Sequence, residues 1–185
     1  MGHIELSSPV SHIWFLRGTP SRLGAIMGMS VSDLEKVIYF AGYIITKVTD
    51  SEKYRILKEI DNEFKNKIKT VTDDKTKEAL KEMATNAKKE VDSIQEGKVL
   101  DEVMYHKFSI KYGGAFEAGI GGEVVYEILK KINLADLEKK IIANLEKANA
   151  IDSEKMNKRL SLIRSMIASG SRPEWMFLTK IPVIP

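Results

Sequence analysis

Two long amphipathic patterns in the middle of the chain constrain its fold more than any other feature of the sequence. Apolar residues recur every three or four positions from Ser51 to Val71, and the pattern restarts at Asp73 or Asp74 and continues to Gly97. Such spacing is typical of helices that bury one face. Because only the short segment TVTDDK separates the two patterns, we expect an antiparallel helical hairpin. Its apolar positions are Leu57, Ile60, Phe64, Ile68 and Val71 in the first helix, and Leu80, Met83, Ala87, Val91 and Ile94 in the second.

Lysine and glutamate fill most of the other positions of this hairpin. Residues 50–98 hold twelve basic and twelve acidic groups, against four and three in residues 1–49 and thirteen and eleven in residues 99–185. Charges of alternating sign favour a solvated face that pairs with itself, although such a face is also compatible with a nucleic-acid surface. The net charge of +3 is too small to decide whether the chain binds nucleic acid.

The composition is that of a globular protein. The 185 residues are 43% hydrophobic and 30% charged, which suits one domain with a sizeable core, or one core with an appendage. The absence of cysteine excludes disulfides and thiolate metal sites. No apolar run approaches the ~20 residues of a membrane span and no signal peptide opens the sequence, so we expect a cytoplasmic protein without a membrane partner.

The segment Gly2–Gly24 carries a repeated helix signal. A hydroxyl residue followed by proline opens each of two short apolar runs, and a glycine closes each run. This is the usual order of residues at helix ends, so we expect short helices within residues 8–18 and 19–28. The first run contains Trp14 and is apolar on most sides, and we expect it to be buried.

Two arginines in this segment differ in their electrostatic setting. Arg17 lies at the end of the first expected helix, where a cation suits the helix dipole, whereas Arg22 lies in the first turn of the second, where a cation does not. Arg22 therefore calls for an anionic partner, although it could also stack on an aromatic ring or be solvated.

The remainder of the chain is expected to be mainly α-helical with a few short β-strands. A helix begins at Ser30 or Ser32, and β-branched alternation predicts a strand over Tyr43–Val48. Further helices are expected at 99–112, 123–132, 134–147 and 152–169, with Asp152 as the cap of the last. That last helix carries basic residues that favour a solvated face but could also approach a nucleic-acid backbone: Lys155, Lys158, Arg159 and Arg164.

The end of the chain changes from helical spacing to strand alternation over residues 175–181. We expect Met176 and Leu178 to pack against residues outside this chain or against the short strand near Ile44. The whole chain is thus divided into a base at 1–49, an inserted hairpin at 50–98 and a helical segment ending in a strand at 99–185.

The sequence offers no candidate catalytic, cofactor-binding or metal-binding residue. Serine, histidine and acidic residues show no arrangement suited to nucleophilic catalysis, and His106 has no second ligand at metal spacing. Asp73 and Asp74 lie in the hairpin turn without further carboxylates. The glycine-rich loop over residues 113–122 could bind phosphate, but it lacks a following Lys-Ser or Lys-Thr, and we interpret it as backbone that needs positive φ.

Three blocks of this sequence resemble the β′ subunit of bacterial DNA-directed RNA polymerase. The first block resembles the stretch after the N-terminal zinc-binding element of that subunit and consists of GHIEL, SPVSHIWFL and TPSRLG. The second block, at Phe116–Leu129, resembles an intervening loop and helix and reads FEAGIGGEVVYEIL. The third block, at Ser169–Pro185, resembles the stretch before the lid loop and reads SGSRPEWMFLTKIPVIP. The order and spacing of the blocks agree with one subunit. Only the segment from Asp50 to about Lys98 is expected to lack a counterpart, as a lineage-specific insertion.

The resemblance implies a fragment of the clamp: a helical core with a projecting hairpin. It implies a parent nucleotidyltransferase whose Mg²⁺-binding aspartates and Zn²⁺-binding cysteines lie outside this chain. Its partners would be DNA, the α, β and ω subunits, and sigma factor. The TPSRLG block implies that Arg17 and Arg22 contact the DNA backbone, with His12 as a third candidate. The alternative is a free-standing helical scaffold or adaptor that binds a partner through the 51–96 hairpin.

Overall fold

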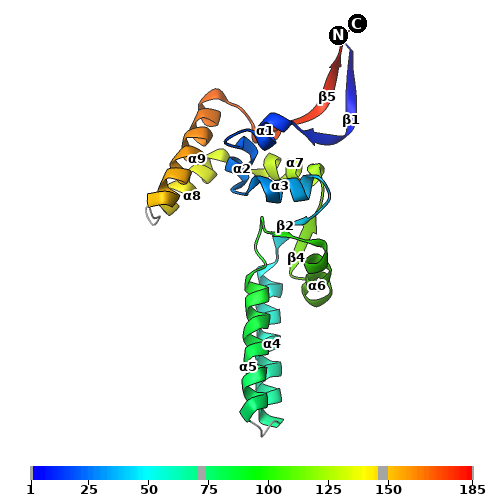
Figure 1. Cartoon of the computed structure of the whole chain (residues 1–185), viewed down its shortest axis with the longest axis vertical. Helices are drawn as coiled ribbons and strands as arrows, with labels where there is room; N and C mark the ends of the chain where they lie inside the picture. Colours follow the sequence, from blue (N-terminus) through cyan, green and yellow to red (C-terminus); the bar gives the residue numbers. More distant parts are fainter. Residues whose placement is uncertain (1, 71–73, 146–149, 185) are drawn as a thin grey trace. The chain divides into compact units, whose positions relative to one another are not determined.

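The computed structural model describes residues 2–70, 74–145 and 150–184, and it is mainly α-helical with short antiparallel strands (Figure 1). This confirms the expected fold class. The helices are α1 (Ile13–Arg17), α2 (Arg22–Met27), α3 (Val31–Ile38), α4 (Asp50–Thr70), α5 (Asp74–Asp92), α6 (Glu102–Tyr112), α7 (Gly122–Lys131), α8 (Leu134–Leu145), α9 (Ala150–Ser169) and the 3-10 turn η1 (Pro173–Met176). The strands are β1 (Gly2–Ser11), β2 (Tyr43–Val48), β3 (Val99–Leu100), β4 (Phe116–Gly119) and β5 (Phe177–Val183).

The chain forms two compact units. Unit 1 comprises Met1–Gly42 and Ile120–Pro185, and unit 2 is the continuous segment Tyr43–Gly119. The division into segments 1–49, 50–98 and 99–185 stays a prediction. None of the helices among the described residues is long and apolar enough to cross a membrane.

Unit 1 contains a two-stranded antiparallel ribbon of β1 and β5, in which Gly2 lies opposite Val183 and Ser11 lies opposite Phe177. The helix expected within residues 8–18 is present as α1, but its expected start is wrong: the Ser-Pro pair lies within β1, where the register is irregular between Glu5 and Val10. Proline has no backbone N–H to donate to the neighbouring strand, so a strand tolerates it where the regular hydrogen bonding is interrupted, as it is here.

The end of the chain follows from the same pairing. The strand expected at 175–181 is present as β5, which begins at Phe177 after the turn η1. It pairs with β1, so the alternative of packing against the strand near Ile44 is wrong, whereas packing against residues outside this chain stays a prediction. Met176 is buried, whereas Leu178 is exposed.

Three short helices with side-chain caps follow β1 in the chain. His12 caps α1, because its Nδ1 accepts a hydrogen bond from the Trp14 backbone N–H at 3.2 Å. Ser21, rather than the expected Thr19, caps α2 through its Oγ, which accepts from the Gly24 N–H at 3.0 Å. The expected end of α2 is confirmed, since Gly28 adopts a left-handed conformation with φ of 70°. The corresponding cap of α3 is Ser30.

The prediction that the first short helix is buried is wrong. Of the five described residues of α1, Leu16 alone is buried, and the Trp14 side chain is 77% exposed. The helix is too short to bury all of its apolar residues: Ile13 and Trp14 are exposed, and Phe15 is half-buried.

Helices α8 and α9 pack side by side in unit 1 around Ile141, Leu160 and Ile163 (Figure 1). Helix α9 already includes Asp152 in its first turn, so this aspartate is not the cap. Its side chain still suits the helix dipole at that position.

Unit 2 is built on the sheet β3-β2-β4, and the predicted strand Tyr43–Val48 is confirmed as β2. The glycine-rich loop contains strand β4, and Val99–Leu100 forms β3 instead of starting a helix, because both segments pair with β2. Helix α6 begins after Asp101, whose side chain accepts from the Met104 N–H. The expected positive φ of the loop occurs at Gly121, with φ of 94°.

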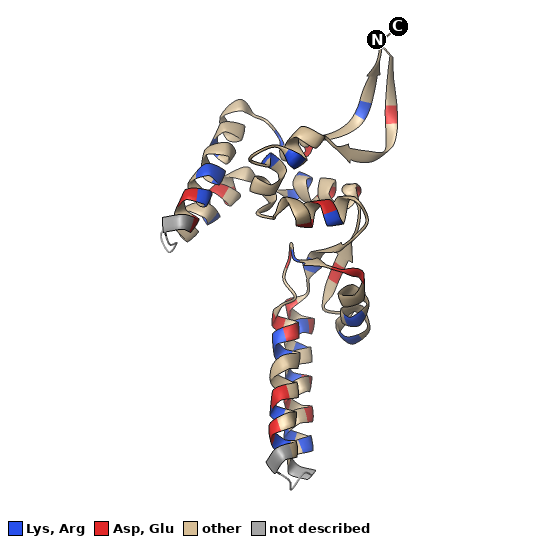
Figure 2. Ribbon diagram, in the orientation of Figure 1, with Lys and Arg blue, Asp and Glu red and all other residues tan. Residues whose placement is uncertain are grey.

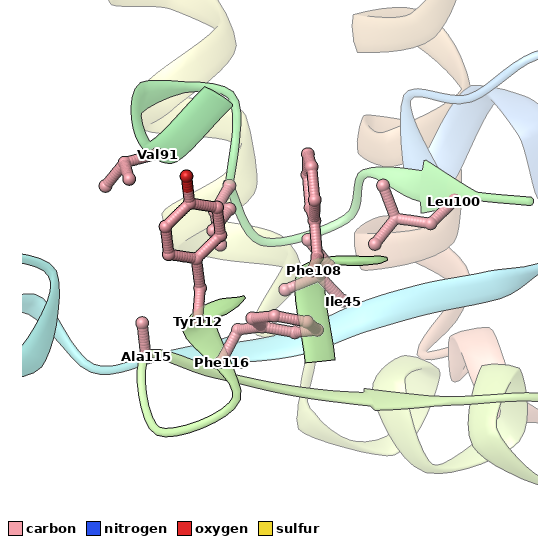
Figure 3. Close-up of a cluster of buried hydrophobic side chains, with 8 residues drawn as sticks. Ile45, Val91, Leu100, Phe108, Tyr112, Ala115 and Phe116 are labelled. Atoms are coloured by element: carbon pink, nitrogen blue, oxygen red, sulfur yellow. The ribbon is translucent and has the colours of Figure 1, made fainter. Parts of the chain in front are cut away.

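A cluster of apolar side chains joins this sheet to the helices of unit 2 (Figure 3). Phe108 of α6 is fully buried at its centre. The other buried members are Ile45, Val91, Ile94, Leu100, Tyr112, Ala115 and Phe116. This core fixes the base of the hairpin.

The predicted antiparallel hairpin is confirmed as α4 and α5, while Asp73 lies outside the described residues. Blue Lys and Arg positions are interspersed with red Asp and Glu positions along the ribbons of both helices (Figure 2). They pair within and between the helices, as in the contact of Lys88 Nζ with Asp61 Oδ1 at 2.5 Å. The hairpin surface thus largely balances its own charge.

Candidate nucleic-acid interface

Unit 1 contains a groove of about 900 Å³ between α1, α2 and α9, which we call the basic groove. Its wall is mostly apolar, but it includes four cationic side chains. The lining residues are Trp14, Phe15, Gly18, Thr19, Pro20, Ser21, Arg22, Gly24, Ala25, Gly28, Met29, Ser30, Val31, Lys155, Lys158, Arg159 and Leu162. No aspartate or glutamate is among these described lining residues.

Arg22 is one of the sequence-predicted candidates, and it lines this groove. It is the first residue of α2, and its guanidinium carbon lies 5.7 Å from the centroid of the Phe15 ring. This stacking was one of the alternatives that the sequence left open. It orients the exposed guanidinium while leaving its donors available to an anion.

Arg159 is held inside the groove wall. Its Nη2 donates to the backbone oxygen of Ile26 at 2.9 Å, and its Nε is buried without a hydrogen-bond partner among the described residues. Partial burial lowers the pKa of the Arg159 guanidinium below its ordinary value. Gly28 leaves room for this group, since a Cβ there would lie 3.0 Å from the guanidinium.

The two lysines of the groove come from the exposed side of α9. Lys158 forms an ion pair with Glu154 at 2.7 Å, and Lys155 lies one turn from Arg159. The sequence favoured a solvated face for these residues, and the structure gathers them with Arg22. The fourth basic residue of this helix, Arg164, instead pairs with Glu138 of α8 at 2.7 Å.

Arg17 lies outside the described lining of the basic groove. It ends α1 as expected, and its Nε donates to Glu35 Oε1 of α3. This hydrogen bond raises the pKa of the Arg17 guanidinium. An anion that binds Arg17 must therefore share it with a carboxylate, which distinguishes it from Arg22.

His12, the third candidate, has a structural task. In addition to capping α1, its ring lies 5.4 Å, between centroids, from the rings of Trp14 and Phe15. It is not among the described residues that line the groove. Any contribution of His12 to binding acts through the orientation of its aromatic neighbours.

A second polar cluster lies in unit 2, where Glu90 of α5 accepts hydrogen bonds from Lys107 and from the Tyr112 hydroxyl. The Lys107 bond lowers the pKa of the Glu90 carboxyl. Burial, with the adjacent Glu90 charge, raises the pKa of Tyr112 to about 12. These groups tie α5 to α6. Among the described residues, no group of three or more His, Asp or Glu side chains could hold a metal ion.

Comparison with known proteins places this chain in a family. A family model described as RNA polymerase Rpb1, domain 1 matches residues 1–185. The chain belongs to the RNA polymerase Rpb1, domain 1 family. This confirms the resemblance to the N-terminal region of the bacterial β′ subunit.

Several relatives of this Rpb1 domain 1 chain are named DNA-directed RNA polymerase subunit beta′. The protein from Caldicellulosiruptor saccharolyticus is 36% identical over the whole chain, which spans 12% of that protein. Those from Weissella hellenica and Fusobacterium nucleatum are 34% and 35% identical over the whole chain, which spans 14% and 11% of them. The chain therefore spans about an eighth of the length of these relatives.

The alignments also bear on the hairpin. They run over 185 or 186 positions and include all of this chain. The expectation that residues 50–98 lack a counterpart in the family stays a prediction.

Proposed function

We propose that this Rpb1 domain 1 chain is part of the clamp of a bacterial RNA polymerase β′ subunit and helps to hold DNA during transcription. The observation that carries the proposal is the basic groove, in which Arg22, Lys155, Lys158 and Arg159 gather without a lining carboxylate. DNA carries one phosphate charge per strand every ~3.4 Å, and cations placed in a groove bind it without reading its sequence.

The arginines suit this task in different ways. Arg22 presents its forked guanidinium at the groove, where it can hold phosphate oxygens in a bidentate manner. Arg17 contributes a contact at the end of α1 for which phosphate competes with Glu35. His12 contacts the rings of Trp14 and Phe15, which line the groove beside Arg22.

The rest of the proposal concerns the parent enzyme. Nucleotidyl transfer, with Mg²⁺ at the reacting phosphates and Zn²⁺ at a structural site, belongs to parts of the subunit outside this chain. The partners are the α, β and ω subunits and sigma factor, and the enzyme is cytoplasmic. This piece contributes binding and no catalytic residue.

A free-standing scaffold is the second candidate function. One observation favours it: Met83 on the α4–α5 hairpin is 68% exposed, and such a side chain suits contact with a partner protein. In that case the hairpin would bind its partner whether or not the basic groove is intact.

Polymerase complexes assembled with an Arg17→Ala, Arg22→Ala double variant test the DNA-holding proposal. Each lost phosphate contact reduces the salt slope of DNA binding by about 0.9, so the slope should fall by about 2 and the complexes should dissociate at lower salt. Arg164→Ala is the matched control, because it removes a paired cation outside the groove and should leave the slope unchanged. Complexes of the double variant with unaltered salt resistance would refute the assignment.

A further inference from the structure

One feature of the basic groove is not needed for holding a phosphate backbone: the exposed ring of Trp14. Trp14 lines the groove with 77% of its side chain exposed, and the neighbouring Phe15 lines it as well. Tryptophan offers a large aromatic surface and is enriched at binding interfaces. A ring of this kind beside cations forms a platform on which a flat, anionic ligand can stack.

The second tryptophan of the chain shows that exposure alone does not make such a platform. Trp175 in η1 is also largely exposed, at 63%, but it is not among the described residues that line the basic groove. Trp14 differs because Arg22 and Lys155 line the same groove. The combination of a ring and several cations therefore occurs at Trp14.

We propose that the basic groove binds an unpaired nucleotide of a single DNA strand, whose base stacks on Trp14 while Arg22 and Lys155 hold the flanking phosphates. This inference rests on the proposed DNA-holding function and specifies its ligand. Base stacking on an aromatic side chain tolerates any base, and cations that follow the backbone supply the remaining affinity.

Duplex DNA suits the aromatic wall less well than a single strand. A paired base inside a duplex has both faces covered by its neighbours, so it cannot lie on Trp14 without being unstacked. The groove volume of about 900 Å³ falls in the usual range of ~300–1,000 Å³ for sites that enclose a small ligand. This volume is large enough for one unpaired nucleotide.

Tryptophan fluorescence of the 185-residue chain tests the inference directly, because the chain has two tryptophans. Trp175→Phe leaves Trp14 as the only emitter, and Trp14→Phe leaves Trp175. A short thymidine homopolymer should quench the first variant and leave the second unchanged. Circular dichroism checks that both variants keep their helices, which we expect because both side chains are exposed.

Binding measurements with four probes separate the possible ligands. The thymidine homopolymer should bind Trp14→Ala at least about fivefold more weakly than the unsubstituted chain, the low end of the effect of one stacked base. An abasic strand of the same length should bind both equally, without quenching. A duplex of the same length and thymidine monophosphate should quench Trp14 far less than the homopolymer.

Several outcomes would overturn the inference. One is equal quenching of the two single-tryptophan variants by the homopolymer. A second is an unchanged affinity of Trp14→Ala for the homopolymer. A third is saturation by thymidine monophosphate at the same concentration as by the strand, because that result would assign the groove to free nucleotides. If duplex binding remains sensitive to salt and to Arg22→Ala while quenching is absent, the inference fails and the proposed function stands. If neither form of DNA binds, both fail.

Discussion

The contact between Gly28 and Arg159 leads to a quantitative prediction about the wall of the basic groove. Gly28 has φ of 70°, and a Cβ there would lie 3.0–3.2 Å from three atoms of the Arg159 guanidinium. Gly28→Ala thus combines two costs. The left-handed conformation costs an alanine about 1 kcal/mol, and displacement of the guanidinium weakens its bond to the Ile26 oxygen, for which ~1–2 kcal/mol is reasonable. We expect a total loss of about 2–3 kcal/mol in the free energy of unfolding.

Gly170 provides the matched control in the same unit. It has φ of 66°, and a Cβ there would meet nothing within 4 Å, so Gly170→Ala carries the conformational cost alone. We expect it to lose about 1 kcal/mol. Urea titrations followed by circular dichroism measure both variants, and hydrogen exchange of the α2 amides confirms that the loss lies in unit 1.

A double-mutant cycle completes the test. Arg159→Ala removes the group that the new methyl would meet, so Gly28→Ala should cost only about 1 kcal/mol in that background. Equal losses for Gly28→Ala and Gly170→Ala, or strictly additive losses for Gly28→Ala and Arg159→Ala, would refute the contact as the reason for glycine at position 28.

Three further predictions follow from contacts in the two units. Glu35→Gln should remove the ion-pair partner of Arg17 and raise the affinity of the polymerase for duplex DNA by about two- to fivefold at low salt, the effect of one added charge contact. Glu138→Gln, which removes the partner of Arg164, should leave this affinity unchanged. Equal effects of the two variants would mean that net charge alone is responsible. Phe108→Ala should cost ~3–5 kcal/mol of unit 2 stability, and urea titration with hydrogen exchange should locate the loss in the core of Figure 3 and leave unit 1 unchanged. The pKa of Tyr112 is raised from its ordinary value of 10.0 to about 12 in the folded state. Tyr112 therefore contributes stability that is fully present below pH 10 and is lost as the pH rises through 12. A spectrophotometric titration should show a late-ionising tyrosine that is absent from Tyr112→Phe.

The elements that the sequence predicted correctly are those whose signal is local. The hairpin has a sustained helical period over each of its arms, and four of the six residues of β2 are β-branched: Ile44, Ile45, Thr46 and Val48. Neighbours in the chain are enough to specify such segments. The left-handed Gly28 was predictable for the same reason, since a glycine that follows a helix is its usual end.

The errors occurred where pairing with a distant segment overrides a local signal. The Ser-Pro pair in β1 is an ordinary helix start by itself, but β1 pairs with β5 at the other end of the chain. Backbone hydrogen bonds to a distant strand outweigh a helix cap, and no local pattern contains them. The same applies to β4, a four-residue strand inside a glycine-rich loop, which forms because β2 lies beside it.

The candidate site was predictable in part. Arg22 stood out because it opposes the dipole of its own helix, and it does line the basic groove. Its association with α9 was not predictable, since the bond that joins these parts links Arg159 to Ile26, 133 positions away. Trp14 was missed because a run that is apolar on all sides indicates burial, and a five-residue helix cannot provide it.

The α4–α5 hairpin of unit 2 can change in length without a change in the rest of the unit. Helix α4 has 21 residues, which at ~1.5 Å per residue gives an arm of about 30 Å. Its contacts are repeated locally along the two helices, as in the pair of Lys88 with Asp61, and the core around Phe108 lies at the base of the arm. Lengthening both helices by seven residues would therefore extend the arm by about 10 Å while leaving that base intact. Evolution could therefore change the length of this arm without changing the core around Phe108 at its base.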